Sequence, residues 1–423
     1  MALAAPLNPS ASKLVPEGEI ITVLAPGEAR LPKRRARPGL STVERFVAVL
    51  SSIIDSDTTV AKVNFTKALE ARSTATLRAM TCDLESYALF ASGHAGAGLP
   101  ASAEKLVEWI DHLEARRQKP ATIARKLATV ATVHGLLGAP SAVSSSLVRD
   151  TMKGLRRRQG KGQRQAAGLR LGEAIGSAPI KGFTLAALME ACGTDLPGLR
   201  DAALLSLGYD AGLRVSELLE ATVEALEVQD DGSGLLDIDR SKTDQEGQGA
   251  SVWASCETMR RIFLWREAAS IRKGPLFRRV GVIRTKGHSG RRALAFGDLA
   301  YNASVDRNRM AAIPARQASV TFVIGDAALT VAAVRSIIRK RALAAADMGL
   351  VDLMGEDLEY ALDSLSTHSL RVGLTQDLFA SGEDAGPIAQ ALRWSSVGTA
   401  LRYGRRLAPA SNAAARLLAS RRV

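Results

Sequence analysis

The sequence predicts a mainly α-helical protein of two domains, the second of which is an α+β domain with a small antiparallel sheet. Three observations predict this. They are the length of 423 residues, an aromatic content of only 4%, and apolar residues that recur at helical spacing between Gly- and Pro-rich breaks. Domains usually hold about 100 to 200 residues, so the chain is long enough for two hydrophobic cores. A fold built mainly from strands would be richer in Val, Ile and Tyr.

The apolar pattern of residues 46 to 158 predicts a compact domain of four or five helices. Serine or threonine N-caps and glycine stops bound the periodic runs. Helices are expected over residues 73 to 93, 102 to 117, 122 to 138 and 144 to 158. Before this domain, residues 1 to 45 contain many prolines and no sustained periodicity, which predicts a disordered basic arm. After it, residues 159 to 180 predict an extended basic linker.

Residues 181 to 423 predict the second domain. Helices are expected over residues 197 to 211, 215 to 226, 257 to 272, 330 to 348 and 367 to 381, and a tail helix after Ser411 or Asn412. Two short runs, 234 to 239 and 250 to 255, predict strands joined by a polar turn. Residues 278 to 325 are rich in Gly, Arg and Ala and show no clear helical or strand pattern.

The excess of positive charge is confined to two segments. The chain carries a net charge of +13, from 56 basic and 43 acidic residues. Residues 30 to 37 hold five basic groups and no acidic one, and residues 149 to 172 hold eight basic groups against Asp150 alone. Such segments suit a polyanion, because each neutralised phosphate releases counterions. A solvated surface with a disordered arm is the alternative. The candidate DNA-binding residues in the second segment are Arg156, Arg157, Arg158, Lys161 and Arg164.

Other features restrict the class of protein. The sequence contains no long, continuously apolar run, so we expect no ordinary membrane span. Pro6 and Pro9 interrupt the N-terminus, which makes it a poor signal peptide, so a cytoplasmic, nucleoid-associated protein is expected. Cys82, Cys192 and Cys256 lie far apart and at no metal-ligand spacing, which predicts free thiols. We expect no metal site and no cofactor.

One ordered set of residues carries the strongest signal. Gly-Leu-Arg-Val-Ser-Glu-Leu spans residues 212 to 218, a lysine follows in the turn between the two strands, and His-Ser-Leu-Arg spans residues 368 to 371. Trp394 and Tyr403 follow, nine positions apart. Each of these residues alone would more often be structural. In this order they resemble the tyrosine recombinase family, also called phage integrases, over roughly residues 60 to 420. The resemblance implies a DNA clamp made of a helical core-binding domain and a catalytic domain.

The resemblance also implies a chemistry. Tyr403 would attack a DNA phosphodiester and form a 3′-phosphotyrosyl intermediate, without metal or ATP. Arg214 and Arg371 would bind the non-bridging oxygens, since guanidinium groups match their geometry. The reaction would be site-specific recombination, namely integration, excision or resolution.

The remaining site residues follow from the same resemblance. His368 would exchange a proton with the nucleophile or the phosphate, and Trp394 would pack over the site and offer its indole N–H. Glu217, one turn after Arg214, would orient the arginines. Lys242 would protonate the leaving 5′ oxygen, although Lys286 also lies in a flexible polar segment and is the alternative.

The implied partners are double-stranded DNA with an inverted-repeat target site and three further copies of the chain, in a homotetramer on two duplexes. Two other function classes stay open. A type IB topoisomerase or a telomere-resolving enzyme would share the pocket and rejoin DNA differently. A non-catalytic DNA-binding protein would use the charge alone.

Overall fold

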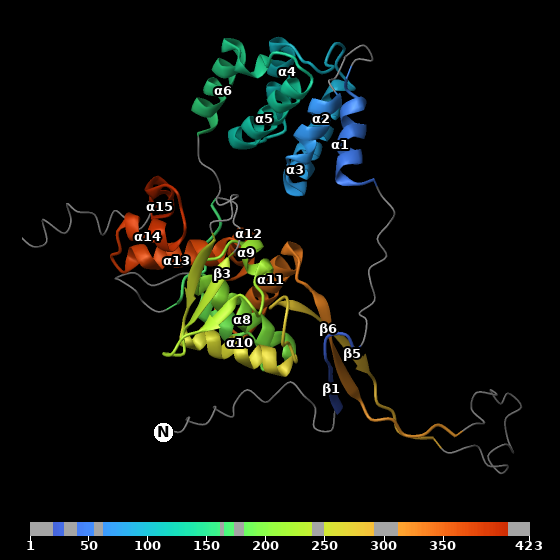
Figure 1. Cartoon of the computed structure of the whole chain (residues 1–423), viewed down its shortest axis with the longest axis vertical. Helices are drawn as coiled ribbons and strands as arrows, with labels where there is room; N and C mark the ends of the chain where they lie inside the picture. Colours follow the sequence, from blue (N-terminus) through green and yellow to red (C-terminus); the bar gives the residue numbers. More distant parts are fainter. Residues whose placement is uncertain are drawn as a thin grey trace, which may run out of the picture. The chain divides into compact units, whose positions relative to one another are not determined.

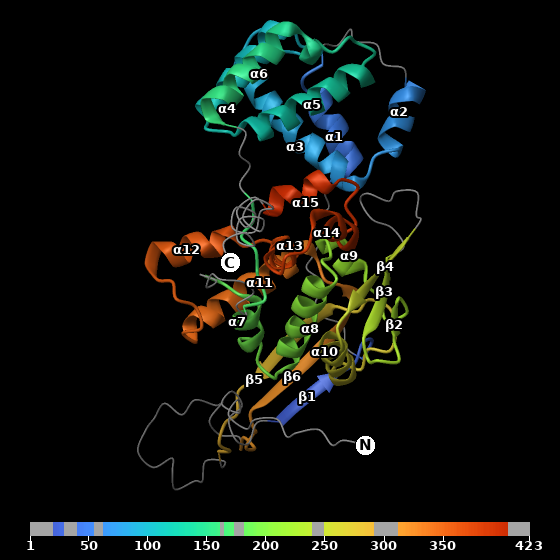
Figure 2. The same ribbon diagram turned by 90° about the vertical axis from the view of Figure 1, so that its left-hand side faces the viewer.

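The computed structural model describes residues 20–28, 40–54, 62–160, 165–172, 182–238, 249–291 and 312–404. The chain divides into two compact units. Residues Arg34–Arg164 form one, here called the small unit. Residues Met1–Lys33 and Gln165–Val423 form the other, here called the large unit. Figures 1 and 2 show both units.

The small unit consists of helices around one apolar core. Its α-helices are α1 (Thr42–Ser51), α2 (Lys62–Glu70), α3 (Thr74–Ala91), α4 (Ala103–Ala115), α5 (Pro120–Leu136) and α6 (Ser146–Gln159). The side chains of Ser73, Ser102 and Ser145 accept hydrogen bonds from the first turns of α3, α4 and α6, which is how the sequence sets where these helices begin. Tyr87 and Trp109 meet edge to face in the core, with ring centroids 4.8 Å apart. The four predicted helices are present, with ends that differ by a few residues.

The helices of the large unit surround α8 (Leu196–Asp210), which packs against α10 (Cys256–Ala268) and α13 (Ser369–Ala380). The others are α7 (Leu185–Glu190), α9 (Val215–Glu220), α11 (Val331–Asp347), α12 (Gly355–Ser364), α14 (Ala385–Ala391) and α15 (Val397–Gly404). The predicted helix over residues 215 to 226 is too long. It ends at Glu220, because Leu226 and its two successors pair with a neighbouring strand, and a local pattern does not show that pairing.

The predicted antiparallel sheet is confirmed. Strands β2 (Leu226–Val228), β3 (Gly234–Ile238) and β4 (Ala250–Ala254) pair in that order. Leu236 and Val252 face each other and point into the core, whereas Trp253 points outward and is exposed. The alternation along β3 and β4 therefore covers one face of the sheet and leaves the other open.

A second sheet includes parts of residues 278 to 325, where the sequence showed no clear helical or strand pattern. β5 (Arg278–Thr285) and β6 (Ser319–Ala328) form an antiparallel pair, and β1 (Ile20–Leu24) adds in parallel to the other edge of β6. In Figures 1 and 2 this sheet lies at the end of the large unit away from α13 to α15. The prediction of a disordered arm over residues 1 to 45 is wrong for β1 and for the start of α1, because strand pairing and a Ser41 cap order them.

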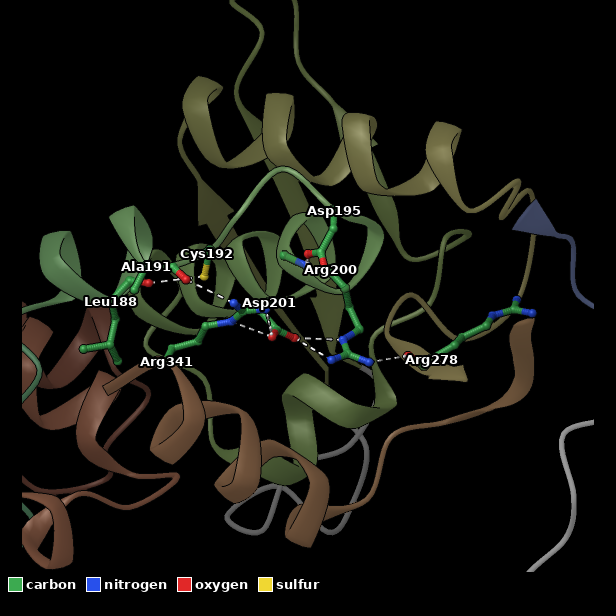
Figure 3. Close-up of polar contacts among 9 residues, drawn as sticks. Leu188, Ala191, Cys192, Asp195, Arg200, Asp201, Arg278 and Arg341 are labelled. Carbon is green, nitrogen blue, oxygen red and sulfur yellow. Dashed lines mark hydrogen bonds and ion pairs between the residues drawn. The ribbon is translucent and has the colours of Figure 1, made fainter. Parts of the chain in front are cut away.

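A buried ionic cluster ties the helices of the large unit to the start of β5 (Figure 3). The Asp201 carboxylate is 1% exposed and accepts hydrogen bonds from the guanidinium groups of Arg200, at 2.6 and 2.9 Å, and of Arg341, at 2.8 Å. Arg341 also donates to the Ala191 carbonyl, and Arg200 donates to the Arg278 carbonyl. Figure 3 shows the two guanidinium groups approaching Asp201 from α8 and α11.

Part of the predicted linker lies against α13. The Leu169 N–H donates to the Ser369 carbonyl, and the Asp377 carboxylate accepts from the Leu171 N–H and from the Tyr209 hydroxyl. Gly373 permits this contact, since a Cβ there would stand 1.9 Å from the Leu169 carbonyl oxygen. Residues 165 to 172 thus hold one side of α13, while its first turn faces the candidate site.

Candidate active site

Helix α13 places His368 and Arg371 together. His368 immediately precedes the helix, and Arg371 lies in its first turn. Residues three apart share a face of a helix, so both side chains point the same way. The sequence predicted a helix over residues 367 to 381, and the structure has it from Ser369 to Ala380.

Helix α15 brings Tyr403 to that face. The Tyr403 hydroxyl oxygen lies 2.9 Å from Nε2 of His368. The phenol ring stacks on Trp394, with centroids 5.2 Å apart and ring planes 8° from parallel. Gly404 allows this approach, because a Cβ there would stand 2.7 Å from the Phe379 ring on α13. Four residues that are up to 35 positions apart in the sequence, namely His368, Arg371, Trp394 and Tyr403, therefore form one cluster.

Arg371 is the most deeply buried member, at 1% exposure. Its two terminal nitrogens donate to the carbonyls of Gly212 and Leu392, and its guanidinium lies 5.1 Å from the centre of the Trp394 ring. Its Nε has no hydrogen-bond partner among the described residues. Burial, together with the positive charges of Arg214 and Arg393, lowers the pKa of Arg371 to about 9.

A second part of the site is the buried carboxylate of Glu217. Arg214 precedes α9 and donates to Glu217 twice, from Nη1 at 2.6 Å and from its backbone N–H at 2.9 Å. Burial acts to raise the pKa of Glu217, but the hydrogen bonds from Arg214 and the charges of Arg393 and Arg214 outweigh it and hold the pKa low. Glu217 is therefore ionised and fixes the position of the Arg214 guanidinium.

Arg393 is the residue that the sequence reasoning missed. Its Nη2 donates to Oε2 of Glu217 at 2.8 Å, whereas Nη1 of Arg214 donates to Oε1, and the Arg393 side chain is 13% exposed. Its backbone has a φ of 54°, the left-handed region that favours glycine. Its position next to Trp394 was the available signal, but an arginine in an Ala-rich helical stretch is usually a surface charge. Two arginines, Arg214 and Arg393, therefore contact a single carboxylate, and Arg371 lies close enough to feel its charge.

His368 completes the electrostatics of the site. Burial, followed by the charges of Arg371 and Arg214, lowers the pKa of His368 below its ordinary value. The imidazole is thus neutral near pH 7. With three guanidinium groups, one carboxylate and a neutral histidine, the site carries an excess of two positive charges and is suited to an anion.

The structure describes only some of the other predicted site residues. Lys242, Lys161 and Arg164 lie outside the described residues, as does the predicted tail helix. Lys286 directly follows β5, on the sheet that Figures 1 and 2 show away from α13 to α15. In the small unit, Arg156, Arg157 and Arg158 lie in the last turn of α6, all exposed. Arg158 is paired with Glu114 at 2.6 Å.

Nowhere in the described ranges do three His, Cys, Asp or Glu side chains gather as metal ligands would. Within the same ranges, no helix is both long and apolar enough to cross a membrane. The three cysteines are unpaired.

The model of the phage integrase family matches residues 180–408, which is more than half of the chain and contains the whole cluster. The chain therefore belongs to the phage integrase family. It is 31% identical, over 213 residues, to an integrase/recombinase xerD homolog from Selenomonas ruminantium. That match covers 48% of this chain and 59% of the relative.

The fold has a counterpart among solved structures. The XerH site-specific recombinase, in a post-cleavage complex with a palindromic difH substrate, aligns with a TM-score of 0.50 at 13% identity. The alignment covers 88% of this chain and 96% of that protein. The predicted fold class, mainly α with a small antiparallel sheet in the second domain, is thereby confirmed.

Proposed function

We propose that this protein is a site-specific DNA recombinase that cuts and rejoins DNA through a 3′-phosphotyrosyl intermediate. One observation carries the proposal. The Tyr403 hydroxyl is hydrogen-bonded to a neutral histidine within a cluster that carries surplus guanidinium charge. A phenol beside a base and an anion site is the arrangement that attack on a phosphodiester requires.

The first step is the attack. The Tyr403 oxygen forms a bond to phosphorus, and its proton passes to Nε2 of His368 across the 2.9 Å contact. The imidazole can accept this proton because its lowered pKa keeps it neutral. Trp394 holds the phenol ring by stacking, so the oxygen keeps its direction as the bond forms.

The arginines act on the transition state. Negative charge grows on the non-bridging oxygens, and preorganised donors in a buried site stabilise it more than donors in water do. Arg371 has two nitrogens held by backbone carbonyls, and the Nε proton and the outer protons stay available for the phosphate. Arg214, held by Glu217, provides the second guanidinium.

The leaving group is the 5′ oxygen of the cut strand, which must gain a proton as the P–O bond breaks. We assign this proton to Lys242, in the segment between β3 and β4, since a desolvated lysine has a lowered pKa and can act as an acid. The phosphotyrosyl bond retains the energy of the phosphodiester. A 5′ hydroxyl of another DNA end can therefore attack it and release Tyr403, with no need for ATP or a metal ion.

DNA contacts in the small unit are assigned to the end of α6 and the residues after it. Arg156, Arg157, Lys161 and Arg164 would bind phosphates through charge, without reading the sequence. Arg158 would contribute least, because Glu114 already neutralises it.

Recombination is favoured over the other strand transfer reactions by the relatives. The curated relative is an integrase/recombinase, and the XerH recombinase of similar fold is bound to a palindromic substrate. A palindrome is an inverted repeat, which a symmetric assembly reads with identical subunits. We therefore propose an inverted-repeat target and a homotetramer on two duplexes. A topoisomerase would relax supercoils without exchanging ends between duplexes, so a two-duplex strand exchange assay separates the two activities.

The covalent step is tested with DNA that the protein itself selects. Binding sites are isolated from a random duplex library with the Tyr403→Phe variant, and a nick is placed next to the cut position so that the short 5′ fragment diffuses away. The parent protein is expected to form a covalent adduct on the 3′ end in the presence of a chelator. Tyr403→Phe should bind the same DNA and form none. An adduct that persists in Tyr403→Phe would contradict the assignment of the nucleophile.

A further inference from the structure

We propose that the outer part of the β5–β6 hairpin binds a second stretch of duplex DNA, outside the segment cut by Tyr403. Here this part is called the ribbon and comprises residues 282–291 and 312–320. The inference rests on the proposed function in taking DNA as the substrate. It adds a contact surface in a region that the catalytic cluster does not use.

The register of the hairpin gathers its basic residues on one face. Arg284 pairs with Val320, and beyond the end of β5 an isolated bridge pairs His288 with Arg316. Directly paired residues of an antiparallel ladder share a face, and so do alternate residues along a strand. Arg284, Lys286, His288 and Arg316 therefore lie on the same face.

This face is cationic and accessible. All four of these side chains are exposed, and the described ribbon contains no Asp or Glu. The first acidic residue along β6 is Asp326, beyond the ribbon. Neither Arg284, Lys286 nor Arg316 forms an ion pair with a described residue of the chain. A surface with basic groups and no acidic ones attracts phosphates and repels cationic partners.

The shape of the ribbon suits a duplex. Residues 284 to 288 span about 13 Å at the usual rise of a strand, and over that length a duplex carries roughly eight phosphates. A two-stranded ribbon also fits the width of a major groove. Since β1 pairs only with Ser319–Val323 of β6, residues 286–291 and 312–318 have no third strand among the described residues. An isolated two-stranded ribbon is only marginally stable in water, so a bound partner would stabilise this one.

The position of the ribbon indicates which DNA it meets. Figures 1 and 2 both show β5 and β6 running away from α13 to α15, the helices that carry the catalytic cluster. The ribbon therefore faces a different part of the surface of the large unit. DNA bound there is flanking DNA of the same duplex, or another duplex, and not the bond that Tyr403 attacks.

The test compares two charge-matched variants in the Tyr403→Phe background. The ribbon variant carries Arg284→Gln, Lys286→Gln and Arg316→Gln. The control carries Arg335→Gln, Arg339→Gln and Lys340→Gln, which remove three exposed charges from α11. Affinity is measured from about 50 to 200 mM salt on a selected site alone and on the same site with about 30 bp of arbitrary flanking sequence on each side.

We expect the ribbon variant to lose affinity for the flanked duplex, by about tenfold or more at the lowest salt. Its salt slope should fall by up to about 2.7, since each lost phosphate contact contributes about 0.9. On the short duplex it should match the control. With Tyr403 restored, both variants should form the covalent adduct on the short nicked site at the parental rate.

Three results would overturn the proposal. Equal affinity of ribbon variant and control on flanked DNA would remove the second contact. Equal losses on both duplexes would place the ribbon on the cleaved segment. Unchanged DNA binding with a smaller assembly in sedimentation would make the ribbon a protein contact. If the parent forms no adduct but the ribbon variant still loses affinity for flanked DNA, the proposed function fails and the ribbon proposal stands.

Discussion

At the scale of single residues, the charge balance around Glu217 decides what the site can bind. The guanidinium groups of Arg214 and Arg393 each donate to one oxygen of this carboxylate, and Arg371 lies close enough for both to lower its pKa. One carboxylate neutralises one guanidinium, so two positive charges remain for the phosphate and for the charge that develops on it. Arg393 does this from a backbone conformation that costs about 1 kcal/mol for a non-glycine residue. An arginine kept at such a position is a functional candidate.

A substitution can separate the effect of the Arg393 charge from the effect of its strained backbone. Arg393→Gly relieves the strain at a φ of 54° and removes the hydrogen bond to Glu217. Because a hydrogen bond to a charged group contributes about 1.5–3 kcal/mol, single-turnover cleavage should fall about 10- to 100-fold while the melting temperature changes little. Arg393→Lys should be intermediate, and Arg402→Ala, on the exposed side of α15, should match the parent. Parental cleavage by Arg393→Gly would assign Arg393 a purely structural role.

The pH dependence of cleavage should report His368. Its pKa is held below about 6.5, the ordinary value, because burial and two arginines disfavour the imidazolium. The neutral form, which accepts the Tyr403 proton, therefore predominates at pH 7. We expect the cleavage rate to be nearly constant from pH 8 to about 7 and to fall along an acidic limb centred below about 6.5. An acidic limb centred at or above pH 7 would contradict this. In His368→Asn that limb should be absent and the plateau lower.

The lowered pKa of His368 also makes the stability of the folded protein depend on pH. The unfolded chain binds a proton on His368 as pH falls through about 6.5, and the folded protein resists it. The folded state therefore loses stability as pH decreases below that value and regains it above. His134 on α5 adds a contribution of the same sign, because burial lowers its pKa as well.

At the scale of elements, the large unit depends on buried charge as well as on apolar packing. The carboxylate of Asp201 joins α8 to α11 and, through Arg200, to the first residue of β5. That position matters beyond the core, because the strand that starts at Arg278 leads into the ribbon. Arg339 and Asp363 also form an arginine–carboxylate pair, 3.1 Å apart, but this pair is exposed to solvent.

These two ion pairs give a matched comparison. Asp201→Ala leaves two buried guanidinium groups without a counterion and should lower the free energy of unfolding by about 3–5 kcal/mol. Asp363→Ala breaks a pair whose side chains are 54% and 68% exposed and should cost less than about 1 kcal/mol. Urea titration followed by circular dichroism measures both. Similar losses of unfolding free energy in the two variants would show that the Asp201 cluster stabilises the protein no more than the exposed pair does.

At the scale of the whole molecule, the chain enters the large unit twice. Met1–Lys33 belongs to it, the small unit follows, and Gln165–Val423 returns to it. The N-terminal segment belongs to the large unit because Ile20–Leu24 pairs with β6. The chain returns to the large unit at residues 165 to 172, which contact α13. Helix α13 also positions His368 and Arg371. The contacts of the linker with α13 therefore stabilise the helix that carries the candidate site.

The C-terminal tail is predicted to join copies of the protein. Residues 409 to 423 lie outside the described residues, and their sequence predicts a short helix with Ala415, Leu417 and Leu418 to bury. Docking of this helix into a neighbour, repeated head to tail, would close a ring of four. Deleting residues 409 to 423 should leave a folded monomer that binds one half-site but loses cooperative pairing on two duplexes, as seen by sedimentation and gel shift. Tetramers of the truncated protein would rule this out, and loss of folding would indicate that the tail packs on its own unit.

The sequence by itself determined the helical fold class, most helix positions, the pairing of β3 with β4 and family membership. It could do so because caps, periodicity and a set of residues in fixed order are local signals, legible without knowing the neighbours. Only the tertiary structure shows the parallel pairing of β1 with β6, the antiparallel pairing of β5 with β6 and the inclusion of Arg393 in the site. Strand partners about 300 positions apart leave no mark in a local pattern. Whether an arginine is a surface charge or a buried partner of Glu217 depends on which side chains the fold brings around it.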